Sequence, residues 1–124
     1  MREILFRGKR IFNSKWVEGF MYSQHFPLEF RDDFYIRCYD TDYLVIPETV
    51  GQYTGLTDKN GMKIFEGDIV KAFSRYDTQH TYAITYRNGV FWFGNWNLVE
   101  FIDRFQFAEV VGNIHDNPEL LQKF

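Results

Sequence analysis

The stretch that decides the fold is residues 50–70, which read VGQYTGLTDKNGMKIFEGDIV. Glycine recurs there at short intervals, at positions 51, 55, 61 and 67, between brief apolar runs. Because glycine enters positive φ without a Cβ penalty, this spacing predicts a chain that reverses repeatedly between short strands. The stretch contains no nucleophile and base at a known spacing, no phosphate-binding glycine loop and no metal-ligand pair. It therefore specifies backbone shape and not chemistry.

The totals predict one compact domain with a large core. The chain has 124 residues, near the modal domain size, and 20% of them are aromatic. The single Cys38 cannot form an intramolecular disulfide, which favours a reducing compartment. The apolar run at the amino terminus is short and interrupted by charge, and no run approaches the roughly 18 apolar residues of a membrane helix. We expect a soluble, cytoplasmic protein that does not bind membranes.

The charge is small in total but unevenly distributed. A net charge of −3 provides no broad cationic field for nucleic acid or an anionic membrane. Residues 1–15 nevertheless carry five Lys and Arg against Glu3 alone, and residues 16–55 carry seven carboxylates against Arg31 and Arg37. Opposite ends of one fold, or two neighbouring subunits, can attract each other through such an asymmetry. The simpler interpretation, which we favour, is two solvated strand faces.

The amino-terminal half predicts two hairpins. The first pairs residues 3–7, which show alternation, with residues 16–22 across the turn at Asn13-Ser14. The second pairs residues 34–39 with residues 43–46, both rich in β-branched and aromatic residues, across the turn at residues 40–42. Residues 23–33 show little periodicity and are predicted to form an exposed loop. Pro47 ends the second hairpin, since proline cannot donate to a strand ladder.

The carboxy-terminal half predicts longer strands, at 69–73, 81–86 and 90–93. Asn88-Gly89 is the strongest hairpin signal in the chain, because a type I′ turn needs positive φ at both positions. A closing strand follows over residues 106–114, with Gly112 marking a bulge.

Two short helices are also predicted. One presents an apolar face after an N-cap at Asn97 that has Glu100 three residues later; its face comprises Leu98, Phe101, Ile102 and Phe105. The other begins at Asn117-Pro118, a capping side chain before a proline at the first helical position.

These elements predict a mainly β fold, with antiparallel strands in two packed lobes of a single domain over residues 1–124. The amino-terminal lobe covers about residues 1–56. The carboxy-terminal lobe covers about residues 62–116, and a short helix follows over about residues 117–122. The turn at Glu66-Gly67-Asp68 and a helix before the last strand are typical of a small SH3-like barrel, a shape that hosts many unrelated functions.

No metal or cofactor is predicted. Asp58-Lys59-Asn60-Gly61 resembles the start of a calcium loop, but Met62 and Lys63 occupy positions 5 and 6, where an oxygen ligand and glycine are required. The histidines are dispersed at positions 25, 80 and 115, without the i, i+2 or i, i+4 spacing that places two imidazoles on one face. A spatial cluster with Asp32, Asp33 or Asp77 is the alternative to ordinary surface histidines.

No catalytic residue is predicted either. Cys38 lies in an aromatic strand, where a buried thiol behaves as a small hydrophobe and lacks an evident base. Glu66 and Asp68 would share one face of a regular strand, as a paired acid and base require, but Gly67 indicates that they flank a turn.

The strongest functional cluster is a set of aromatic residues with one arginine between residues 82 and 96. Phe91 and Phe93 share one strand face and Trp92 takes the other, so one set is core and the opposite set can be exposed. The candidate binding residues are Tyr82, Tyr86, Arg87, Trp92 and Trp96. Rings beside a guanidinium can stack unpaired bases, but Arg87 is the only Lys or Arg between residues 77 and 102. A protein interface explains the same rings more economically. If all the rings pack internally, neither surface exists.

Four segments carry a family resemblance through their order and spacing: Arg2 to Lys9, Trp16 to Gly19, residues 50–70, and Gly112 to Leu121. Together they resemble the YopX family of bacteriophages and prophages nearly end to end, although residues 23–46 and 74–106 contribute little. His115-Asp116 stand where family members often show Tyr-Glu. The resemblance implies a β-rich fold, a phage or prophage origin and a cytoplasmic protein of uncharacterised function. It supplies no established catalytic or binding residues.

The sequence therefore predicts an accessory protein that is not an enzyme and acts by binding. Its partner is expected to be a second copy of itself or a host or phage protein. The alternative is single-stranded nucleic-acid binding through the carboxy-terminal lobe, and a third hypothesis is a hydrolase with an undetected carboxylate or histidine site.

Overall fold

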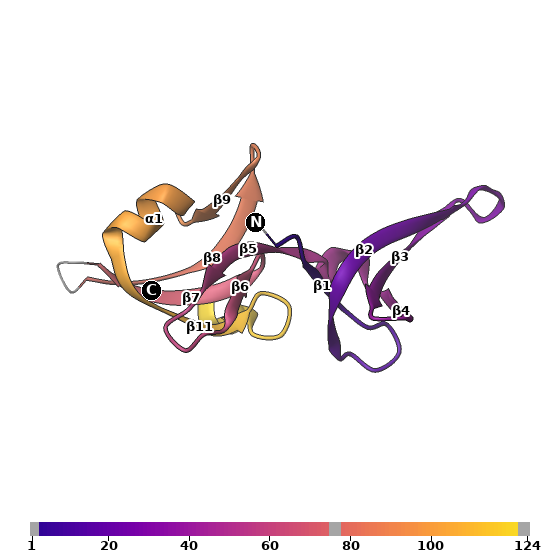
Figure 1. The fold of residues 1–124 in the computed structure, drawn as a ribbon, viewed down its shortest axis with the longest axis horizontal. Coiled ribbons are helices and arrows are strands. Elements are labelled where there is room, and N and C mark those ends of the chain that lie inside the picture. Colours follow the sequence, from indigo (N-terminus) through magenta and orange to yellow (C-terminus); the bar gives the residue numbers. More distant parts are fainter. Residues whose placement is uncertain (1–2, 75–77, 122–124) are drawn as a thin grey trace. The chain divides into compact units, whose positions relative to one another are not determined.

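The computed structural model describes residues 3–74 and 78–121 and is mainly β (Figure 1). By its contacts the chain divides into two compact units, Met1–Tyr53 and Thr54–Phe124. The paired strands in both are antiparallel, so the prediction of a mainly β, antiparallel fold with short helices is confirmed. Within the described residues, no helix is long and apolar enough to cross a bilayer.

The first unit is a meander of β-strands. Its strands are β1 (Phe6–Lys9), β2 (Trp16–Phe26), β3 (Arg31–Cys38), β4 (Thr41–Val45) and the start of β5 (Gly51–Thr57). Neighbours hydrogen-bond in the order β4-β3-β2-β1-β5. Two 3₁₀ helices, η1 (Pro27–Glu29) and η2 (Pro47–Thr49), connect β2 to β3 and β4 to β5. Each begins with proline, whose fixed φ and missing N–H suit a helix start.

The core of the first unit is thin. Ile36 and Val45 are buried, and Gly8 lies so close to the Val45 side chain that a Cβ there would meet it at 3.1 Å. Thr49 links η2 to β1, because its Oγ1 accepts a hydrogen bond from the Lys9 N–H at 2.9 Å and donates to the Ile46 carbonyl at 2.6 Å. A few buried groups and backbone bonds thus hold this unit.

The prediction of a loop over residues 23–33 is wrong. β2 continues to Phe26 and β3 starts at Arg31, so these residues form the end of a long hairpin with the pairs Ser23↔Phe34 and His25↔Asp32. Most side chains there are exposed on both faces of the ribbon. A strand without a buried face has no reason to alternate apolar and polar residues, which is why periodicity missed it.

The second unit contains the remaining strands and the α-helix. They are β6 (Lys63–Phe65), β7 (Asp68–Ser74), β8 (Gln79–Arg87), β9 (Val90–Phe93), β10 (Trp96–Asn97), α1 (Leu98–Arg104), β11 (Phe105–Asn113) and a terminal 3₁₀ helix, η3 (Pro118–Leu121). A five-stranded sheet has the order β10-β9-β8-β7-β11, and β6 hydrogen-bonds to β5. Among the described strands β10 and β11 end the sheet, so it is not closed into the barrel that the sequence predicted. Helix α1 fills the connection between those two strands.

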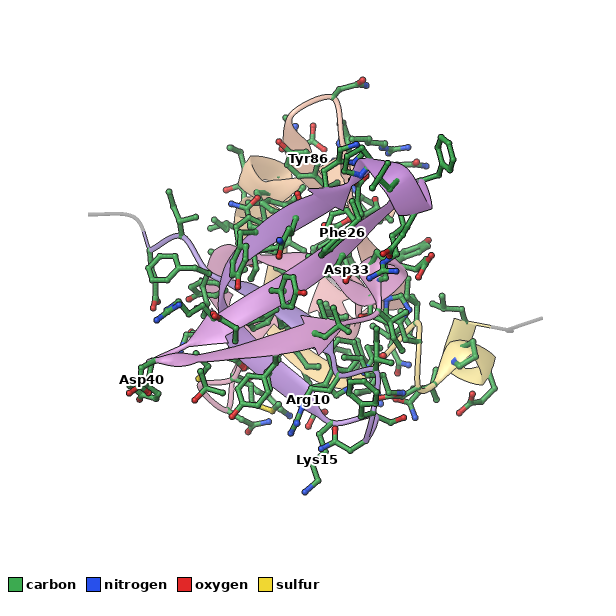
Figure 2. The ribbon with its side chains drawn as sticks, turned by 90° about the vertical axis from the view of Figure 1, so that its right-hand side faces the viewer. Arg10, Lys15, Phe26, Asp33, Asp40 and Tyr86 are labelled. Atoms are coloured by element: carbon green, nitrogen blue, oxygen red, sulfur yellow. The ribbon has the colours of Figure 1, made fainter. Side chains whose placement is uncertain are left out.

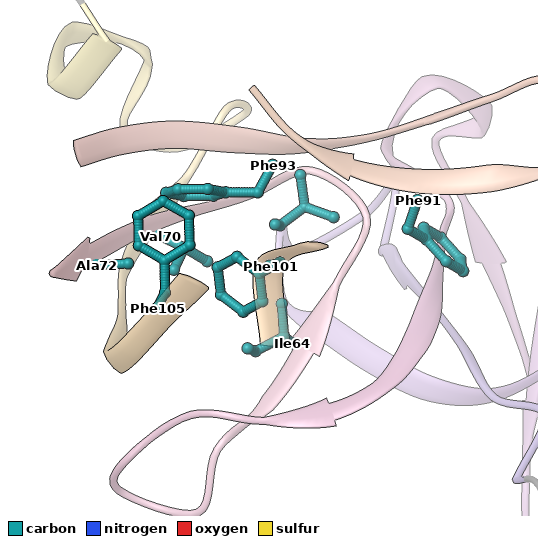
Figure 3. Close-up of a cluster of buried hydrophobic side chains, with 8 residues drawn as sticks. Ile64, Val70, Ala72, Phe91, Phe93, Phe101 and Phe105 are labelled. Atoms are coloured by element: carbon teal, nitrogen blue, oxygen red, sulfur yellow. The ribbon is translucent and has the colours of Figure 1, made fainter. Parts of the chain in front are cut away.

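The core of the second unit is dense and aromatic (Figure 3). Its buried residues come from strands and helix alike: Ile64, Val70, Ala72, Ile84, Phe91, Phe93, Phe101 and Phe105. Phe93 lies at its centre, with ring centroids 5.0 Å from Phe101 and 5.1 Å from Phe105. Edge-to-face pairs of this kind add to the free energy of burying the rings.

Three local signals are confirmed. Asn88 and Gly89 have φ of 54° and 77°, as a type I′ turn between β8 and β9 requires. Asn97 caps α1, accepting the Glu100 N–H at 3.0 Å. The β11 register shifts between Val110 and Gly112, where the bulge was predicted. Ile102, expected on the buried face, is 60% exposed, because the helix has seven residues and turns only its Phe101 side fully inward.

The decisive stretch depends on one buried carboxylate. Asp58 is 6% exposed; its Oδ1 accepts the N–H groups of Asn60 at 2.8 Å and Met62 at 2.9 Å. Its Oδ2 accepts the Val110 N–H at 3.0 Å, across to β11. The residue that suggested a calcium loop thus closes a turn and attaches that turn to the last strand.

Replacing Asp58 with Asn tests this role. An amide can accept on only one of its two terminal atoms, so the bonds to the turn and to Val110 cannot all persist. We expect a loss of about 1–3 kcal/mol in the free energy of unfolding, measured by urea titration. Asp40→Asn, at the exposed β3–β4 turn, is the matched control and should change little. Equal stability of the two variants would contradict the assignment.

The same carboxylate makes stability depend on pH. Burial raises the pKa of Asp58, but the N–H donors of Val110, Met62 and Asn60 outweigh it and the net shift is downward. The carboxylate therefore stabilises the fold above its unfolded pKa of about 3.9, and this contribution disappears as pH falls through the lower folded pKa. The stability difference between the wild type and Asp58→Asn should be constant between about pH 5 and pH 8 and shrink below about pH 4. A stability difference that persists unchanged in acid would contradict this role of the Asp58 carboxylate.

Candidate binding surfaces

The predicted aromatic binding set is divided between two faces of the second unit. In the β8–β9 ladder, Ile84 pairs with Phe93 and Thr85 pairs with Trp92. Residues directly opposite in an antiparallel pair share a face, so Trp92 lies on the side away from buried Phe93. Tyr86, which pairs with Phe91, lies on the core side. The structure therefore does not bring the five predicted residues together as one surface.

Three of the five pack against the core. Tyr82 contacts Phe93 at a centroid distance of 5.2 Å, and Tyr86 contacts Phe91 at 4.9 Å, both with rings steeply inclined. Trp96 lies 5.3 Å from Phe105. Tyr82 and Tyr86 still expose 39% and 48% of their surface, so they form the rim of the core.

Arg87 and Trp92 form a pair on the opposite face. The Arg87 guanidinium lies 4.5 Å from the centroid of the Trp92 ring, and the indole Nε1 donates to the Arg87 carbonyl at 3.2 Å. Arg87 Nη2 also donates to the Gly94 carbonyl at 3.4 Å. A groove of about 610 Å³ along β8 includes Arg87, His80 and two threonines, and contains no carboxylate among the described residues. The Arg87 guanidinium is thus already occupied by one ring and one carbonyl.

The histidines do not converge. His25 Nδ1 lies 2.6 Å from Asp32 Oδ1 on the β2–β3 hairpin, while His80 packs among rings, 5.2 Å from Trp96. His115 is in the turn after β11. Asp77, considered as a partner, lies outside the described residues. Elsewhere in the described chain, no three His, Cys, Asp or Glu side chains are placed to hold a metal ion.

The candidate nucleophile and carboxylates have structural surroundings. Cys38 is half-buried at the end of β3. Asp68 is 2% exposed and its Oδ2 accepts the Phe65 N–H at 2.7 Å. Glu66 and Asp68 flank Gly67, whose φ is 92°, so they bracket a turn as expected.

Sequence reasoning missed the most exposed apolar side chains, most of which belong to the first unit. Among the described residues, six large apolar side chains are at least 70% exposed: Phe12, Phe20, Leu28, Phe30, Tyr39 and Val99. Five of these are in the first unit. Four of these five lie in or beside turns, where an apolar residue has no core to enter, whereas Phe20 lies within β2.

One of these residues lies on the outer sheet face, defined by Phe20 and Tyr22 on β2, Tyr35 and Arg37 on β3, and Asp42 on β4. Tyr22 and Tyr35 are directly paired and their rings stack at 5.1 Å. Arg37 pairs with Asp42 at 3.2 Å. Partial desolvation and a hydrogen bond to Asp42 raise the pKa of the Tyr22 hydroxyl, which stays protonated at neutral pH. The face is aromatic, neutral and internally ordered.

A second feature is the hairpin tip, residues 26–33. Leu28 and Phe30 are each 94% exposed, and Phe30 has a positive φ of 51°. Arg31 contacts Glu29, donates from Nε to Asp33 at 3.1 Å, and has its guanidinium 4.7 Å from the Phe26 ring. These contacts fix the charged residues around an apolar end.

A third feature is the basic turn, residues 9–15, between β1 and β2. Phe12 is 83% and Ile11 44% exposed. The Arg10 guanidinium lies 4.4 Å from the Tyr43 ring, and Lys15 is exposed just before β2. Figure 2 shows Arg10 and Lys15 at one end of this unit and Phe26 and Asp33 toward the other.

The division of aromatic residues between faces can be tested by truncation. Phe93→Ala should lower the free energy of unfolding by about 3–5 kcal/mol, because a buried ring is lost and a cavity is left. Trp92→Ala should cost only about 1–2 kcal/mol, for one hydrogen bond and one cation–π contact. Urea titration of both variants measures the difference. Equal losses would show that the two faces had been assigned wrongly.

Comparisons with known proteins agree with the fold. The YopX protein family model matches residues 6–122, nearly the whole chain. The crystal structure of protein EF1440 from Enterococcus faecalis is similar, with a TM-score of 0.62 and 25% identity over 98% of this chain and 100% of that one. No curated protein matched the sequence. The resemblance seen in the sequence is thereby confirmed, and this chain belongs to the YopX family.

Proposed function

We propose that this protein is a phage or prophage accessory protein that works in the cytoplasm of a bacterial host by binding another protein. The first unit is the binding part. The observation that carries the proposal is the concentration there of apolar side chains that are at least 70% exposed. Apolar surface of this kind, bordered by polar residues, is typical of interaction sites.

The outer sheet face has the composition of an interface centre. Aromatic residues with few torsions, such as Phe20, Tyr22 and Tyr35, bury much area at low entropy cost. Tyr22 and Tyr35 already stack, so little order is lost on binding. Arg37 and Asp42 neutralise each other beside them, which limits the charge that must be desolvated.

The second unit suits a supporting role. Its rings fill its own core, and Arg87 is the one cation of the predicted binding set, whereas single-strand binders line a groove with several. The groove along β8 brings one histidine and no carboxylate among the described residues, which offers no acid and base pair for hydrolysis. Protein binding by the first unit therefore has the stronger support.

Phe20→Ser tests the proposal, with Val99→Ser as matched control. Both side chains are strongly exposed, at 70% and 77%, but Val99 lies on α1 in the second unit. Other proteins are recovered by pull-down from host cells, and light scattering shows whether the wild type is monomeric. We expect Phe20→Ser to weaken binding about tenfold or more and Val99→Ser to leave it unchanged.

Two outcomes would contradict this proposal. One is a wild-type chain that stays monomeric and recovers no protein at all. The other is binding that survives Phe20→Ser but is abolished by Trp92→Ala; if that binding is to labelled single strands and weakens with salt, the nucleic-acid alternative replaces it.

A further inference from the structure

We propose that the partner of the first unit includes a second copy of the same chain, bound head to tail: the hairpin tip of one copy docks on the basic turn of the next. This inference rests on the proposed function and names the partner and the two surfaces. It follows from three features of these surfaces: their charge, their apolar side chains and their separation.

The charges of the two surfaces are complementary. The hairpin tip carries Glu29, Asp32 and Asp33 against Arg31, three carboxylates and one guanidinium. The basic turn, residues 9–15, carries three cations and no carboxylate. Opposite charge patterns of this kind steer association and fix its register. The asymmetry visible in the sequence therefore lies at two defined places.

Each surface also has two exposed apolar side chains. Leu28 and Phe30 are each 94% exposed at the tip, and Phe12 is 83% exposed beside Ile11 in the turn. Burying four such side chains against each other supplies the non-directional part of the binding free energy, while the charges supply direction. An acidic tip is repelled by an anionic membrane or a nucleic acid, so those occupants fit it poorly.

The two surfaces cannot meet within one chain. They flank β2, which has 11 residues and is about 35 Å long at roughly 3.3 Å per residue. Lys15 precedes the strand and Pro27 follows it, and Figure 2 shows the labelled residues toward opposite ends of the unit. The contact therefore joins different patches of two copies. Such heterologous contacts propagate into rings or open chains.

Charge reversal at each surface tests the proposal. The turn variant is Arg10→Glu with Lys15→Glu, and the tip variant is Glu29→Lys with Asp33→Lys. In low salt the wild type should scatter light as assemblies larger than one chain of 15.0 kDa. Each variant alone should be monomeric. An equimolar mixture should assemble again, since the intact tip of one variant meets the intact turn of the other and the two reversed surfaces are also opposite in charge.

Several results would overturn the inference. They are a monomeric wild type, a variant that still assembles alone, or a mixture in which both folded variants stay monomeric. If charge reversal unfolds either variant, Leu28→Ser with Phe30→Ser, and separately Phe12→Ser, remove only exposed side chains and should also yield monomers. A monomeric wild type that still binds another protein through Phe20 would refute head-to-tail assembly and leave the proposed function standing.

Discussion

The carboxylate of Asp58 is the interaction on which the second unit depends. It accepts two N–H groups of its own turn and one from β11, 52 positions along the chain. Glycine allows the backbone of residues 50–70 to enter positive φ, but this freedom alone is compatible with many turn conformations. A buried anion that requires three donors selects one of them, since leaving those donors unpaired would be costly. The core can then fill because its last strand is held in place.

The two units differ in how they place their apolar side chains: the second packs its rings in a core, and the first exposes several of its own. Phe93, Phe101 and Phe105 meet inside the second unit, where a helix and a sheet enclose them. Among its described residues the first unit has strands and two short 3₁₀ helices but no α-helix to cover the sheet, and its hairpin extends beyond its buried residues Ile36 and Val45. A sheet without a cover must expose apolar rings or replace them with polar residues. The first unit exposes the rings of Phe20 and Tyr22.

Local signals made much of the second unit predictable. The turn at Asn88-Gly89 and the cap at Asn97 depend on residues within three positions, so the sequence contains all that decides them. The hairpin over residues 23–33 depends on cross-strand pairs without a buried face, which leave no periodic trace. The five predicted binding residues lie on two faces for another reason. Alternation correctly separated Phe93 from Trp92, but the β8 side chains could be assigned to a face only from their register.

An exposed aromatic face invites aggregation unless something restricts what it can bind. Here charged pairs lie among the rings: Arg37 with Asp42 on the outer sheet face, and Arg31 with Asp33 near the tip. A partner that covers Tyr22 must also match these charges, because stripping water from an unmatched pair costs more than the apolar contact gains. The same charges that keep the free surface in water therefore narrow its choice of partner. Aromatic rings can therefore be exposed on this small sheet without binding every apolar surface they meet.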